Sequence, residues 1–154
     1  MDTTDWRDDL KISFGDLQVI EKCRAEAIEQ FDQFCDYVVE PAFEALAEEF
    51  KEYQIKMKTW KAPGKSIHLE IRFPKSRIDQ FHYILWMPRN SVELKLKLTT
   101  RARKTRFGPL EEKSVPFIEN VTPKEILKLD KEALAQDVVA RYKKLLYETA
   151  VVSD

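Results

Sequence analysis

The spacing of apolar residues changes once along this chain, near residue 52, and this change limits the folds that the chain can adopt. From Ser13 to Phe50, apolar residues recur every three or four positions, which is the period of one face of an α-helix. From Tyr53 to Leu98, they alternate with polar residues, which is the period of a half-buried β-strand. The two periods predict a helical layer followed by a sheet, and therefore an α+β fold.

The helical segment is predicted to be long and interrupted. Ser13, followed three residues later by Asp16, resembles a capping box and marks the expected start. An unbroken helix over 13–51 would be about 60 Å long, roughly twice the diameter of a domain of this size. Pro41 lacks a backbone N–H and clashes with the preceding turn. We therefore expect a bend there, with one helix ending near Val39 and a second beginning at Pro41.

Four alternating segments separated by short turns follow the helical segment. They cover residues 53–60, 67–73, 81–87 and 92–98. Antiparallel strands can be joined by short turns, whereas parallel neighbours need crossovers of a dozen or more residues. The pattern predicts a four-stranded antiparallel meander. The charged connection over 101–120 could hold a short fifth strand near Val115 to Ile118.

The chain is predicted to close with one or two helices. Thr122, Pro123 and Glu125 fit the N-cap, first position and box partner of a short helix, and Asp130 precedes a last helix. The expected buried stripe of that helix is Leu134, Val138, Tyr142, Leu145 and Leu146. A chain of 154 residues without repeats or linkers indicates one domain over 1–154. The predicted fold is a long N-terminal helix, bent near Pro41, packed on the meander and closed by these helices.

The chain lacks the features of an exported or membrane protein. Residues 1–10 are acidic and polar, unlike the basic start and apolar core of a secretory signal. No apolar run approaches the roughly 18 residues that a bilayer span needs. Cys23 and Cys35 would lie about 18 Å apart on the expected helix, too far for a disulfide. We expect a cytoplasmic protein with reduced cysteines and no membrane association.

The net charge of −1 conceals a segregation of charge along the chain. Residues 1–50 carry 4 basic and 14 acidic side chains, whereas residues 51–108 carry 15 basic and 4 acidic ones. The predicted helix is therefore acidic and the predicted sheet is basic. Segregation of this kind bears on partners and solubility rather than on fold.

If the alternation holds, one face of the sheet packs on the helix and the other collects cations and aromatic rings. Basic side chains interleaved with flat aromatics suit phosphate attraction and base stacking. The alternative is a solvated sheet face, or an acidic helix lying against a basic sheet in the same molecule or in a dimer partner. The candidate binding residues are Lys56, Lys58, Trp60, Arg72, Trp86, Lys95, Lys97, Arg101, Arg103, Lys104 and Arg106.

A second hypothesis is an enzyme. Glu93 and Lys95 form an acidic-x-Lys triplet, and Asp79 precedes it. This arrangement resembles the metal-dependent nucleases with a PD-(D/E)xK site, in which two carboxylates hold Mg²⁺ and the lysine positions or activates water. The match covers three residues, and Ile78 stands where that family has proline. The resemblance implies a catalytic set of Asp79, Glu93 and Lys95.

A metal site and a ligand pocket are two further candidates. His68 and His82 are expected on the same face of neighbouring strands, as diagonal neighbours that could ligate a metal. A third functional option is a small hydrophobic ligand held between the helix and the curved sheet.

The leading hypothesis is a non-catalytic binding module without a cofactor, which uses the basic, Trp-containing sheet face to hold a nucleic acid or an acidic protein. The aromatic residues of the helical stripe also favour a homodimer, because one sheet face is small for covering them.

Overall fold

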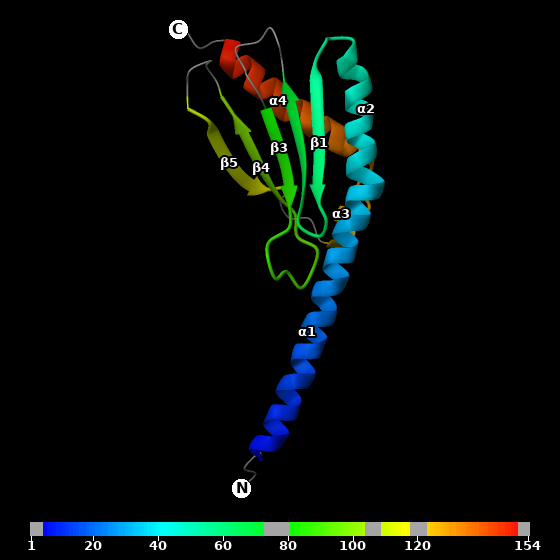
Figure 1. Ribbon diagram of the computed structural model, residues 1–154, viewed down its shortest axis with the longest axis vertical. Coiled ribbons are helices and arrows are strands. Elements are labelled where there is room, and N and C mark those ends of the chain that lie inside the picture. The colour runs from blue at the N-terminus through cyan, green and yellow to red at the C-terminus, as the bar shows by residue number, and fades with distance from the viewer. Residues whose placement is uncertain (1–4, 73–80, 104–108, 118–122, 151–154) are drawn as a thin grey trace.

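The computed structural model describes residues 5–72, 81–103, 109–117 and 123–150. It shows a five-stranded antiparallel sheet with helices packed on one of its faces (Figure 1). The predicted α+β class is confirmed. A long helix runs beside the sheet and continues well beyond it.

The N-terminal helical segment has three parts. Helix α1 covers Trp6–Phe34, the π-helical segment η1 covers Cys35–Val39, and helix α2 covers Glu40–Lys51. The helix begins before the predicted capping box at Ser13, because Asp5 caps it: Oδ1 of Asp5 accepts a hydrogen bond of 3.2 Å from the N–H of Arg7. Asp8 and Asp9 in the first turn also favour this start through the helix dipole.

The interruption predicted at Pro41 takes the form of a π-helical turn. Pro41 sits in the first turn of α2, and the N–H of Glu40 donates to the carbonyl of Cys35. The wider turn accommodates the missing N–H of proline without ending the helix. The ribbon is therefore continuous through this point and only gently curved (Figure 1).

The sheet is a meander, as predicted, with five strands rather than four. Its strands are β1 (Lys56–Ala62), β2 (Ser66–Arg72), β3 (Phe81–Trp86), β4 (Lys97–Ala102) and β5 (Glu111–Pro116). They pair in sequence order, each antiparallel to its neighbours. The fifth strand begins earlier than the suggested 115–118, and residue 118 lies outside the described part of the chain.

The strand predicted over 92–98 is largely wrong. β4 begins only at Lys97, and residues 91–96 have no regular strand structure. Leu94 and Leu96 are nevertheless buried, and the carbonyl of Leu96 accepts a hydrogen bond of 3.3 Å from Phe117. The alternation of apolar residues over 92–96 therefore reflects burial at the rim of the core rather than pairing of a strand.

Helices α2 and α4 cover one face of the sheet. Helix α3 covers Pro123–Leu127 and α4 covers Lys131–Ala150. At the start of α4, Oδ1 of Asp130 accepts a hydrogen bond of 2.8 Å from the N–H of Ala133. The buried ring of Tyr83 meets α2 through Phe43 and α4 through Asp137. The predicted stripe of α4 is buried except for Leu146, which is 37% exposed.

The first two thirds of α1 project away from the rest of the molecule (Figure 1). Residues 5–22 are all exposed, and Ala27 is the first buried residue of α1. Cys23 and Cys35 are both free, as expected from their separation. Among the described helices, none has the length and apolar character of a membrane span.

Candidate anion-binding surface

The strand register decides which side chains share the face of the sheet away from α2 and α4, here called the outer face. Directly paired residues lie on the same side of an antiparallel sheet. One row across the sheet is Trp60, His68, Ile84, Thr99 and Ser114, and the next is Lys58, Glu70, His82, Arg101 and Glu112. Lys56, Arg72, Trp86 and Lys97 extend these rows on the same side. The predicted gathering of cations and tryptophans on one face is thus present in the register.

Trp60 lies at the centre of an aromatic cluster on the outer face. Its ring stacks on His68 with centroids 4.9 Å apart, and it meets His82 edge-on at 6.3 Å. The ammonium of Lys58 lies 5.7 Å from the ring centroid. Trp60 is 39% exposed, but His68 occupies one face of its ring. Packing within the sheet therefore already covers part of the ring surface of Trp60.

Trp86 is half-buried and hydrogen-bonded. Its Nε1 donates to Oγ1 of Thr99 at 2.9 Å, and Thr99 bonds Ser114 at 2.9 Å. Lys97 places its ammonium 5.5 Å from the ring centroid. The indole is therefore held in a defined orientation at the end of β3.

Carboxylates neutralise part of the outer face. The Nε of Arg72 donates to the buried Glu70 at 2.7 Å, and Arg101 donates to Glu112 at 3.2 Å. Lys56, Lys58 and Lys97 remain as cations without a carboxylate partner among the described residues. The face is basic, but less strongly than the count of its cations suggests.

The remaining predicted binding residues lie outside the five strands or outside the described residues. Lys95 is exposed on the segment before β4, 3.8 Å from Glu93. Arg103 follows β4 and is partly buried, and Lys104 and Arg106 lie outside the described residues. Lys95 was predicted on this face by the alternation over 92–98, where β4 begins only at Lys97. Arg103, Lys104 and Arg106 were predicted because they follow that segment in the chain, which does not establish a common face.

The two histidines pack on Trp60, and the pKa of each is lowered from its ordinary value. Burial lowers the pKa of His68, with smaller contributions from the charges of Arg101 and His82. Burial also lowers the pKa of His82, although the carboxylate of Glu70, 3.8 Å away, opposes this shift. The predicted diagonal placement is confirmed by the register, which pairs His68 with Ile84. No cluster of three metal-ligating side chains occurs among the described residues.

The nuclease-like set is not assembled in the described part of the chain. Glu93 and Lys95 are exposed and pair with each other before β4, and Asp79 lies outside the described residues. Between α2 and β1, where a hydrophobic ligand was considered, a cavity of about 370 Å³ is lined by Phe43, Met57 and Trp60, but also by Glu40 and Glu44. Its mixed lining does not favour an apolar ligand.

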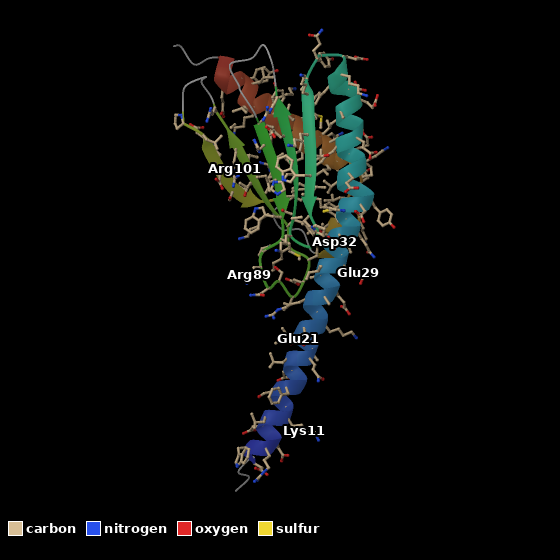
Figure 2. All side chains as sticks on the ribbon, in the orientation of Figure 1. Lys11, Glu21, Glu29, Asp32, Arg89 and Arg101 are labelled. Carbon is tan, nitrogen blue, oxygen red and sulfur yellow. The ribbon has the colours of Figure 1, made fainter. Side chains whose placement is uncertain are left out.

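The structure adds a site that the sequence did not indicate. A cleft of about 710 Å³ lies between α1, the turn from β1 to β2 and the segment after β3. This surface, here called the basic cleft, is formed by Arg24 and Ile28, by residues 64–66 and by residues 86–91. Figure 2 shows Arg89 on the segment that extends from the sheet on the side of α1. The volume of the basic cleft falls within the range that is typical of ligand sites.

The basic cleft carries positive charge without local compensation. Arg24, Lys65 and Arg89 line it, and no described carboxylate does. None of the three forms an ion pair with a described residue. The Nε atom of Arg24 is buried and has no hydrogen-bond partner in that part of the chain. Trp86 lines the cleft on the side of the sheet and is paired with Lys97 in the register of the outer face.

Known proteins do not identify this chain. Models of protein families, curated proteins and solved structures all yielded no match. The geometry of the site therefore carries the functional argument.

The residues of the basic cleft were missed because they come from three distant segments. Lys65 follows Gly64 in the first hairpin turn, and Arg89 precedes Asn90 in the turn after β3; both Gly64 and Asn90 have positive φ. Cations beside such turns are a sequence signal, but nothing in the sequence shows that both turns face Arg24.

Proposed function

We propose that this protein is a non-catalytic binding module that holds an acidic segment of another protein chain. The observation that supports this proposal best is the basic cleft, where Arg24, Lys65 and Arg89 lie beside an oriented indole and have no carboxylate partner within the described part of the chain. A carboxylate entering the cleft would gain charge-assisted hydrogen bonds from guanidinium groups, which are among the stronger polar contacts in proteins.

An acidic protein segment fits this surface better than a nucleic acid does. Base stacking needs free aromatic faces, and His68 already occupies one face of Trp60. Phosphate binding needs uncompensated cations along a path, and Glu70 and Glu112 neutralise Arg72 and Arg101 on the outer face. Lys56, Lys58 and Lys97 are spread along the outer face, whereas Arg24, Lys65 and Arg89 line a single cleft, which suits a short segment.

The proposal extends to a cytoplasmic homodimer. The free thiols of Cys23 and Cys35 support a reducing compartment. The exposed apolar side chains of α1 support association with another chain, since soluble monomers rarely display contiguous apolar surface of this extent.

A binding titration tests the proposed function. Fluorescently labelled protein at nanomolar concentration is titrated with an oligoglutamate peptide and, separately, with a single-stranded oligonucleotide. We expect the peptide to bind, and we expect its affinity to fall as salt is added. Arg24→Glu, Lys65→Glu and Arg89→Glu should each weaken binding at least tenfold, whereas Lys22→Glu, an exposed cation on another side of α1, should leave binding unchanged.

Two outcomes would overturn this function. One is the absence of peptide binding in all salt conditions. The other is a preference for the oligonucleotide that persists in the three charge-reversal variants, because binding would then lie elsewhere on the molecule.

A further inference from the structure

The projecting part of α1 carries an apolar stripe on one side. Trp6, Leu10, Phe14, Leu17 and Ile20 are each between 37% and 62% exposed. At 100° per residue they fall within one sector of the helix. Ala27 and Phe31, which are buried in the core, continue the same sector. The stripe is therefore an extension of the face by which α1 packs on the sheet.

A lone helix of this kind is poorly stabilised. Residues 6–26 would extend about 30 Å from the body, and isolated helices of about this length are marginal in water. In proteins, packing of the apolar face supplies most of the stability of a helix. We therefore expect the exposed apolar stripe of α1 to pack against a partner helix.

The charges beside the stripe specify an antiparallel copy of the same helix. In heptad terms Leu10, Leu17 and Arg24 occupy one core position, and Trp6, Ser13 and Ile20 occupy the other. In antiparallel pairing, Leu10 packs on Ile20 of the partner subunit, and Arg7 lies beside Glu21 of the partner subunit. The two-fold axis passes near Phe14, so that each favourable contact is made twice.

Parallel pairing would be unfavourable. It would stack Arg24 on Arg24 of the partner subunit and place Asp16 beside Glu21 of the partner subunit, which brings like charges together at two levels. It would also bring both sheet domains to the same end of the helix pair. Antiparallel pairing leaves one like-charge contact, between the two copies of Asp16, on the solvent side of the axis.

The antiparallel register also supplies an acidic segment for the basic cleft. It brings Trp6 of the partner subunit to the level of Arg24, which lines the cleft. Asp5 caps this end of the helix, and Asp8 and Asp9 lie in its first turn. A helix end rich in carboxylates thus reaches the mouth of a cleft whose three cations have no ion-pair partner among the described residues.

We propose that two copies of this chain associate through antiparallel α1 helices, with the acidic first turn of each helix docked at the basic cleft of the other. This inference rests on the proposed function, because it identifies the acidic segment that the cleft holds. Covering five half-exposed side chains on each copy would bury about 1,000 Å², which is near the lower limit for a specific interface, and cleft contacts add to this area.

Charge exchange between Arg7 and Glu21 tests the register. The mass of the wild-type protein in solution, measured by light scattering after size exclusion, should be twice the 18.2 kDa of one chain. Arg7→Glu alone and Glu21→Arg alone each place like charges together and should dissociate at least tenfold more readily. An equimolar mixture of the two variants should form a mixed dimer of wild-type affinity, and the double variant should also recover it. Both positions lie on the exposed, projecting part of α1, so near-UV circular dichroism should show that the packed core of the sheet domain stays folded.

Two matched comparisons test the face and the direction. Leu17→Ser should abolish the dimer, whereas Val19→Ser, at an even more exposed apolar position on the opposite side of α1, should not. In a Cys23→Ser background, Phe14→Cys should form a disulfide between copies, and Trp6→Cys should not, because only positions near the axis meet their own copy.

A monomeric wild-type protein, a dimer unaffected by Leu17→Ser, or cross-linking through Trp6→Cys would each overturn this arrangement. Peptide binding distinguishes it from the proposed function. The monomeric Leu17→Ser variant should bind oligoglutamate more tightly than wild type at micromolar protein, because its cleft is no longer occupied. A charge-dependent wild-type dimer whose Leu17→Ser variant binds no acidic peptide would overturn the proposed function and leave the helix pairing intact.

Discussion

The backbone N–H of Gly64 donates a hydrogen bond of 2.7 Å to Oδ1 of Asp32, and this bond holds the turn between β1 and β2 against α1. Gly64 has φ of +71°, and a Cβ atom there would lie 2.9 Å from Cγ2 of Ile28. The position therefore requires glycine both for its backbone conformation and for the close approach of the helix. Because Ile28 and Gly64 both line the basic cleft, this contact also sets one of its walls.

Gly64→Ala is expected to lower the free energy of unfolding by about 1–2 kcal/mol, from the left-handed conformation together with the displacement of Ile28. Urea titration measures this loss. Gly15→Ala is the matched control, because Gly15 lies within α1 with nothing within 4 Å of an added Cβ. That change should raise helix content, since alanine is favoured over glycine in a helix by about 1 kcal/mol. Equal destabilisation by both substitutions would contradict this explanation.

The neutral histidines under Trp60 should make stability depend on pH. Because burial holds the pKa values of His68 and His82 below their ordinary 6.5, the folded protein binds fewer protons than the unfolded chain as pH falls below that value. Stability is therefore complete above pH 6.5 and decreases as pH falls toward the folded pKa values. Urea midpoints measured between about pH 7 and pH 5 should decline, in the range where histidine is the main titrating side chain.

The double variant His68→Asn, His82→Gln serves as the comparison for this prediction. It should have a lower midpoint at neutral pH, because the stack with Trp60 is weakened, but a flatter dependence on pH. If wild type and variant declined in parallel, the histidines would not be the groups responsible.

The hydroxyl of Tyr83 connects the sheet to α4. Tyr83 is fully buried, and its hydroxyl donates to Oδ2 of Asp137, which also accepts from Arg141 at 2.9 Å. Tyr83→Phe keeps the ring in contact with Phe43 but removes the donor to a carboxylate, and should cost about 1.5–3 kcal/mol in unfolding free energy. Thermal or urea unfolding measures the loss. Near-UV circular dichroism should show that the core is retained, and a change below the error of the measurement would argue against the bond.

The two thiols should differ in reactivity. Burial raises the pKa of Cys35 to about 12, so that its thiolate is scarce near neutral pH, and its side chain is also inaccessible. Cys23 is partly exposed. Iodoacetamide should therefore modify Cys23 first in the folded protein and both thiols in urea, as read by mass spectrometry. Modification of both at equal rates without denaturant would show that the π-helical region opens readily.

The period of the apolar residues determined much of the fold, because helices and strands expose side chains at fixed local intervals. It predicted the long helix, the meander and the closing helix, whereas the local chemistry of Pro41 and Asp130 predicted the interruption and the start of the last helix. It failed at Ser13, where an earlier acidic cap was stronger, and at 92–96, where buried leucines alternate without a strand partner. It also placed Trp60 and Trp86 on one face, since side chains in a strand alternate.

Only the tertiary structure decided which cations remain uncompensated. Glu70 and Glu112 reach Arg72 and Arg101 through strand pairing, and the pairing register is not contained in either strand alone. The basic cleft likewise joins Arg24, Lys65 and Arg89 from a helix and two turns, brought together by packing of the hairpin on α1. Local sequence determines on which side of its helix or strand each side chain lies. Contacts between distant segments determine its neighbours, and therefore whether a cation has a carboxylate partner.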